Sequence, residues 1–202
     1  MRKLIIILWF TSLFATDDNA PLQRTRDREV DIHHIKIDVA IDLESKSVSG
    51  YVIHTLSAFH SELTSFSLDA EDMEIRRARL NGKDISYNQT GKKVYLKLNQ
   101  AIAWEDTVKV RLDYTAHPRK GTYFISPDST YPEKPWQAWT QGEDTDNHHW
   151  VPIYDYPNDK ATFEVILTVD KKFKAISNGE LLSVNDNKNG THTWHWKENF
   201  PM

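Results

Sequence analysis

A carboxamide and a carboxylate lie two residues apart in the run Trp139-Thr140-Gln141-Gly142-Glu143. A carboxylate accepts strong, charge-assisted hydrogen bonds from cations, including the ammonium group at the start of a peptide. A carboxamide both donates and accepts hydrogen bonds without carrying charge. Because most exposed carboxylates bind nothing specific, these residue types alone favour a solvated acid over a binding group at Glu143.

The nine histidines form no recognisable metal-binding motif, and none of them opens H-E-x-x-H. His148 and His149 are adjacent, and adjacent side chains in an extended chain point in opposite directions. His192 and His195 lie three apart in a predicted strand and are expected to face opposite sides. Zinc needs several convergent ligands, so we expect this chain to contain no metal site and no catalytic residue. The chain has no cysteine, which excludes disulfides, thiolate metal sites and a cysteine nucleophile.

Alternation of apolar and polar residues predicts the elements that must position these side chains. The pattern is clearest in residues 35–43, 94–98, 108–114 and 161–169. Asn81-Gly82 is a strong hairpin signal between two of the shorter runs. We therefore predict an all-β fold of antiparallel sheets with one buried and one wetted face. Residues 131–157 show no period, and such long irregular segments in β domains often carry function.

The N-terminal residues have the pattern of an export signal. Arg2 and Lys3 precede an apolar stretch of about a dozen residues, which is too short to span a bilayer. We expect residues 1–20 to be a signal peptide, with cleavage near Ala15 to Ala20, and residues 21–28 to be a leader to a domain over 29–202. This predicts an exported protein, periplasmic or extracellular; a buried N-terminal strand is the alternative.

The overall composition excludes some partners. The net charge is −4 and no basic block stands out, so nucleic acid is not an expected partner. The mean hydropathy of −0.61 argues against an integral membrane protein, and we expect no transmembrane segment.

Several motifs together resemble the signature block of the aminopeptidase N family of zinc metallopeptidases. Family members carry T-Q-x-E, an aromatic-Pro-x-aromatic-Asp-x-Pro run, K-A-T-F and an S-N-G turn, in that order. The resemblance covers about residues 29–202, and the combined block is specific although T-Q-x-E alone would be weak. The matching segments are Thr140-Gln141-Gly142-Glu143, Trp150-Val151-Pro152-Ile153-Tyr154-Asp155-Tyr156-Pro157, Lys160-Ala161-Thr162-Phe163 and Ser177-Asn178-Gly179.

The resemblance implies a saddle-shaped, sandwich-like antiparallel β domain at the N-terminus of a zinc-dependent aminopeptidase. In the family this domain precedes a catalytic domain, which binds zinc through H-E-x-x-H and a distant Glu. Those motifs are absent here, and at Phe200-Pro201-Met202 the family usually continues into one more strand, so we expect the chain to stop before the domain's last strand and before the catalytic domain. The parent protein would then be a zinc metallo-aminopeptidase that removes N-terminal residues from peptides, with zinc bound by the missing domain. The 202-residue chain alone would be inactive.

The resemblance also implies roles for individual residues. Glu143 matches the carboxylate that binds the free N-terminus of the substrate, and Gln141 matches a residue lining the pocket for the substrate's first side chain. The expected partners are thus the peptide N-terminus and the catalytic domain of the same protein. Asp155 is expected to be structural, accepting hydrogen bonds from turn N–H groups. Gly142 and the His148-His149 pair depart from the family, which usually has a bulkier residue and arginine there.

Two other functions remain open. The missing zinc motif and the tryptophan-rich segment suit a non-catalytic secreted β module that binds peptide or glycan, and a purely structural domain is a third possibility. Glycosylation sequons begin at Asn88 and Asn189, and they matter only if the source glycosylates secreted proteins.

Overall fold

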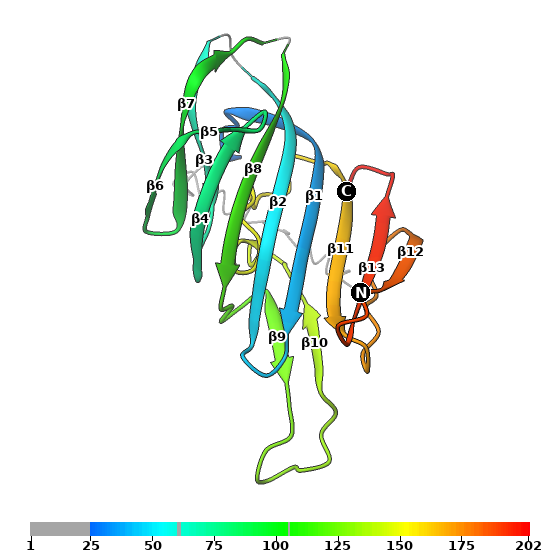
Figure 1. The fold of residues 1–202 in the computed structure, drawn as a ribbon. Coiled ribbons are helices and arrows are strands. Elements are labelled where there is room, and N and C mark those ends of the chain that lie inside the picture. Colours follow the sequence, from blue (N-terminus) through cyan, green and yellow to red (C-terminus); the bar gives the residue numbers. More distant parts are fainter. Residues whose placement is uncertain (1–24, 60–61, 105) are drawn as a thin grey trace, which may run out of the picture.

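The computed structural model describes residues 25–59, 62–104 and 106–202, and these form β-strands joined by turns and loops (Figure 1). The expected signal peptide lies outside the described residues. No helix in the part that the structure describes is long and apolar enough to cross a membrane. The elements in chain order are β1 (Val30–Asp42), β2 (Ser47–Ala58), β3 (Leu63–Asp69), β4 (Met73–Leu80), β5 (Lys83–Asp84), β6 (Ser86–Thr90), β7 (Lys93–Ile102), β8 (Thr107–Ala116), β9 (Thr122–Ile125), β10 (Gln137–Thr140), the 3₁₀ helix η1 (Asn147–His149), β11 (Thr162–Asp170), β12 (Glu180–Asp186) and β13 (Thr191–Glu198).

The largest sheet has eight strands in the order β12-β13-β11-β1-β2-β8-β4-β5. Its neighbours pair antiparallel, which confirms the predicted all-β fold, with one exception. β1 and β11 run parallel, from His34 opposite Thr162 to Ala40 opposite Thr168. Parallel neighbours require a long crossover connection. Here the chain leaves β8 and reaches β11 through a crossover segment, residues 117–161, which contains the irregular residues 131–157. The crossover therefore brings that segment across the sheet.

Strict alternation of side chains creates the buried face of this sheet. In β8, Val108, Val110, Leu112 and Tyr114 are buried while the residues between them are exposed or half-buried. The alternations predicted in residues 35–43, 94–98, 108–114 and 161–169 coincide with β1, β7, β8 and β11. In each of these four strands the apolar side chains point to the inner side of its sheet, because successive side chains of a strand alternate between its two faces.

A second, three-stranded sheet β3-β7-β6 lies beside the β4 and β8 end of the large sheet (Figure 1). Its inward residues, among them Phe66, Leu68, Val94 and Leu96, join the buried residues of the large sheet in one hydrophobic cluster. Two sheets sharing one core give the expected sandwich-like arrangement.

The predicted Asn81-Gly82 hairpin is confirmed. It joins β4 to β5, and both residues have positive φ, 48° and 84°. Positive φ at both central residues is the geometry of a type I′ turn, which asparagine and glycine adopt at little cost.

His54 fastens the crossover segment to the sheet. It lies on β2, is fully buried, and its Nε2–H donates a hydrogen bond of 2.9 Å to the carbonyl oxygen of Pro152. Burial disfavours the charged imidazolium and lowers the pKa of His54 to about 4. The unfolded chain, with a histidine pKa near 6.5, therefore takes up a proton at mildly acidic pH while the folded chain does not.

We expect this difference to make folding weaker in mild acid. The stabilisation by neutral His54 is complete above about pH 6.5 and is lost as the pH falls toward 4, because the unfolded state then binds more protons. Between pH 7.5 and pH 5 the loss in free energy of unfolding attributable to His54 is about 2 kcal/mol. Urea titrations of the wild type and of His54→Gln at both pH values measure it. Glutamine can still donate to Pro152 but does not titrate, so an unchanged pH dependence in the variant contradicts the assignment.

Candidate functional site

The crossover segment between β8 and β11 carries the residues singled out by sequence. As expected for residues 131–157, most of it is irregular, with only β10 and the short η1 as regular elements. β9 and β10 pair as a hairpin stem that projects beyond the end of the large sheet (Figure 1). Gln141, Gly142 and Glu143 thus follow directly after β10 of this hairpin, where the chain turns back toward η1.

Backbone hydrogen bonds define the turn that holds Glu143. The Gln141 N–H donates to the Gly121 carbonyl at 3.0 Å, and the Asp146 N–H donates to the Gly142 carbonyl at 3.0 Å. Both bonds fix the backbone on either side of Glu143. Its side chain is exposed, and among the described residues it has no ion-pair or hydrogen-bond partner. A charged group held on a fixed backbone and left unpaired is available to a ligand.

Glu143 lines a cavity of about 750 Å³ between the crossover segment and the inner face of the large sheet. Ile35 and Phe163, from β1 and β11, contribute to the sheet side. Trp136 and Trp139 line the opposite side. The lining is mostly apolar and aromatic with a few polar groups, which is the usual composition of a small-ligand site. Its charged residues are Glu143, Asp144, Asp155, Asp159 and Lys174. Gln141, the other residue predicted to contact substrate, is exposed and is not among the cavity's lining residues.

The tryptophans of this segment differ in environment. Trp150 packs against the hydrophobic core, as expected for a packing residue. Trp139 stacks on Tyr123 with ring centroids 4.6 Å apart, yet it remains 45% exposed. Trp136 is also exposed. The aromatic surface beside Glu143 is therefore only partly used in packing.

Asp155 has the structural role expected from its sequence context. The buried carboxylate accepts hydrogen bonds from the His148 backbone N–H at 2.9 Å and from His148 Nδ1–H at 2.8 Å. The hydrogen bond from the ring, which favours the charged imidazolium, raises the pKa of His148. The Asp155 N–H in turn donates to Asp69 Oδ2 at 3.0 Å. Asp155 therefore connects η1 to the end of β3.

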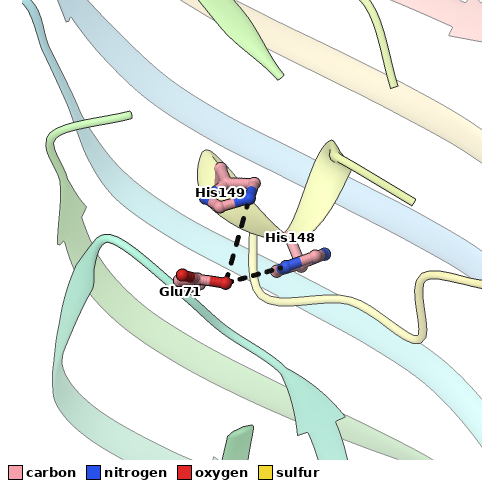
Figure 2. A group of neighbouring side chains, drawn as sticks. All are labelled: Glu71, His148 and His149. Atoms are coloured by element: carbon pink, nitrogen blue, oxygen red, sulfur yellow. Dashed lines mark ion pairs between the residues drawn. The ribbon is translucent and has the colours of Figure 1, made fainter. Parts of the chain in front are cut away.

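The expectation that His148 and His149 point in opposite directions is wrong. They lie in η1 and not in an extended strand, and their rings stack with centroids 4.5 Å apart and planes inclined by 29°. Successive residues of a tight helix are rotated by about 120°, because a 3₁₀ turn contains three residues. Glu71, on the connection between β3 and β4, lies against both rings (Figure 2). Sequence reasoning missed Glu71, which stands 77 residues before His148 in no motif.

A model of the Peptidase M1 N-terminal domain matches residues 31–202. Leucyl aminopeptidase of Saccharolobus solfataricus is 32% identical over 113 residues, which cover 55% of this chain and 13% of that protein. Leukotriene A-4 hydrolase of Xenopus laevis is 21% identical over 182 residues, which cover 85% of this chain and 30% of that protein. The chain thus spans less than a third of the length of either relative.

Similar folds occur in solved structures. An M1 zinc metallopeptidase mutant from Deinococcus radiodurans, bound to a Tyr-Ser-Ala substrate, superposes with a TM-score of 0.74 and 25% identity. The match covers 88% of this chain and 41% of that one. Native yeast LTA4 hydrolase superposes with a TM-score of 0.71 over 86% of this chain and 27% of its own, at 15% identity, which speaks for the fold alone.

Proposed function

This chain belongs to the peptidase M1 family, of which it forms the N-terminal domain, and on that premise we propose that it binds the free N-terminus of peptide substrates for a zinc-dependent aminopeptidase. The observation that carries the proposal is the Glu143 carboxylate, which lines a mostly apolar cavity and has no partner in the part of the chain that the structure describes. The relative from Deinococcus radiodurans, which binds a Tyr-Ser-Ala substrate, supports peptides as the ligand class.

Charge and surroundings explain how Glu143 would select an N-terminus. A peptide ammonium can donate up to three hydrogen bonds, and a carboxylate accepts such bonds with the added attraction of opposite charges. Glu143 is exposed in the free domain, so the apolar walls would strengthen this attraction only once a bound peptide excludes water from it. An internal peptide N–H carries no charge and would gain much less. Glu143 would therefore act on binding and positioning, and it would take part in no bond-making step.

Zinc belongs to the partner domain in this proposal. The family's H-E-x-x-H motif is absent from this chain, so its residues do not fit the catalytic metal. Zinc held by a catalytic domain would supply Lewis-acid chemistry for hydrolysis of the peptide bond. This chain would supply the carboxylate that binds the α-ammonium group of the residue to be removed.

An apolar edge of the domain supports the catalytic domain as its partner. Leu181, Leu182 and Val184 are exposed on β12, and Ile176 just before it is 80% exposed. Clustered apolar side chains at a surface indicate an interaction site. We propose that this edge faces the rest of the same protein.

Hydrolysis of an aminoacyl-arylamide tests the proposal. A protein that joins this domain to its catalytic domain should cleave the substrate, lose activity with a chelator, and leave the N-acetylated substrate intact. The 202-residue chain alone, with zinc added, should not cleave it. Cleavage by the short chain would contradict the division of labour between the domains. Inactivity of both proteins would favour a non-catalytic module that binds peptide or glycan.

A further inference from the structure

Three potential metal ligands from distant parts of the chain converge at one point (Figure 2). Glu71 Oε2 lies 3.5 Å from His148 Nε2 and 3.9 Å from His149 Nε2, and all three atoms lie within 4.8 Å of one another. Ligand atoms around a tetrahedral zinc ion are about 3.3 Å apart, given bonds of about 2.0–2.1 Å. The two distances from Glu71 Oε2 exceed this separation by about 0.2 and 0.6 Å, so small side-chain adjustments would be needed to bring the atoms to coordination distance.

The hydrogen bonds of the two imidazoles direct the correct nitrogen atoms inward. His148 Nδ1 lies 2.8 Å from Asp155 Oδ2, and His149 Nδ1 lies 2.8 Å from Asp72 Oδ2. A carboxylate can only accept, so each Nδ1 must carry a proton, and metal binding, which displaces any proton from Nε2, would then use the Nε2 lone pair that points inward. Carboxylate–histidine–metal chains of this kind orient the ligating histidines of known metal centres.

Burial leaves one of these atoms, His148 Nε2, in need of a partner. The side chains of His148, His149 and Glu71 are only 12%, 5% and 18% exposed. His148 Nε2 is buried and has no well-directed hydrogen bond among the described residues, whereas Glu71 Oε2, also buried, faces the Lys92 ammonium at 2.9 Å. Buried polar atoms are nearly always satisfied, and an unsatisfied one suggests a missing water or ion.

We propose that Glu71, His148 and His149 bind one divalent first-row transition metal ion, with Zn²⁺ the best match to two imidazoles and one carboxylate. Asp146 Oδ1, 3.8 Å from His149 Nε2, or a water molecule can fill a fourth position. The ion would connect the β3–β4 connection to η1, close behind the turn that carries Glu143. The ion would have a structural role, since it would link two segments that lie far apart in the sequence.

Lys92 is the main competitor for the site. Its ammonium lies 2.9 Å from Glu71 Oε2, the same oxygen that faces both histidines, while Arg119 lies 3.5 Å from Glu71 Oε1. The Lys92 side chain is 72% exposed and flexible, so it can move into solvent when a metal ion binds. Removing this ammonium should therefore strengthen metal binding, whereas it would only weaken a cluster held together by ion pairs.

Zinc titration of the 202-residue chain tests the proposal, because this chain lacks the family's catalytic zinc motif. After treatment with a chelator and its removal, calorimetry should show one Zn²⁺ bound per chain, and thermal unfolding should shift upward, since a ligand that binds the folded state stabilises it. Glu71→Gln and His149→Gln should each weaken binding at least tenfold. Lys92→Met should strengthen it severalfold.

His195→Gln is the matched control, since His195 Nε2 also meets a carboxylate, Glu164 Oε2, at 2.6 Å on a different part of the sheet. It should leave zinc affinity unchanged. The proposal is overturned if the wild type binds no stoichiometric zinc, if His195→Gln abolishes binding, or if Glu71→Gln has no effect. Weaker binding in Lys92→Met would also count against it.

Discussion

Glu143→Ala, in a protein that joins this domain to its catalytic domain, is expected to lower kcat/KM for peptides with a free N-terminus at least tenfold. A tenfold loss corresponds to about 1.4 kcal/mol of transition-state stabilisation, a modest value for an ammonium–carboxylate hydrogen bond beside apolar walls. The carboxylate has no partner among the described residues, so its removal leaves no buried group unsatisfied. The loss should therefore appear in kinetics with little change in the free energy of unfolding. Steady-state assays and a urea titration measure the two quantities separately.

Glu133→Ala is the control for this prediction. Glu133 is exposed in the same crossover segment and does not line the cavity. Glu133→Ala changes the net charge by the same amount as Glu143→Ala. We expect wild-type kcat/KM in this variant. Equal losses in the two variants would mean that the net charge of the segment matters and the position of Glu143 does not.

Gly121→Ala is expected to lower the free energy of unfolding by about 3 kcal/mol, the largest stability effect that we predict for a single methyl group. Gly121 has φ of +71°, and a Cβ atom there would lie 1.9 Å from the carbonyl oxygen of Asp146. That oxygen belongs to the backbone and cannot rotate away. The clash would separate the backbone at Gly121 from the backbone at Asp146. It would also strain the hydrogen bond from the Gln141 N–H to the Gly121 carbonyl, which holds the Glu143 turn.

Gly91→Ala separates the clash from the cost of positive φ. Gly91 also has positive φ, +59°, but a Cβ atom there meets nothing within 4 Å. Only the left-handed conformation is then unfavourable, which costs about 1 kcal/mol. Urea titrations of both variants give the difference. If Gly121→Ala loses no more stability than Gly91→Ala, the close approach to Asp146 is not a constraint in solution.

The strands of this fold could be predicted from sequence because alternation reports directly on burial. Val108, Val110 and Leu112 point inward for the same reason that they recur every second residue. The pairing partner of each strand could not be predicted in this way. The apolar faces of β1 and β11 fit parallel or antiparallel neighbours equally well, and only the path of the crossover segment sets their parallel pairing.

The residues of the candidate site also differ in whether sequence alone could identify them. Glu143 could be singled out because it stands in a motif whose residues are close in sequence, and its function stays a prediction. The Glu71 contact with η1 could not be found, because it depends on the bridge that places Asp69, at the end of β3, beside Ile153. The histidine pair was misjudged because an extended backbone was assumed for residues that form a 3₁₀ turn.

The most direct test of the central claim measures the contribution of the substrate ammonium with and without Glu143. Inhibition constants would be compared for a short peptide and for its analogue without the α-amino group, in the wild type and in Glu143→Ala. If Glu143 binds the ammonium, the wild type should prefer the amine by at least tenfold, and Glu143→Ala should lose most of that preference while binding the analogue as the wild type does. A variant that keeps the full preference for the amine would show that another group recognises the N-terminus.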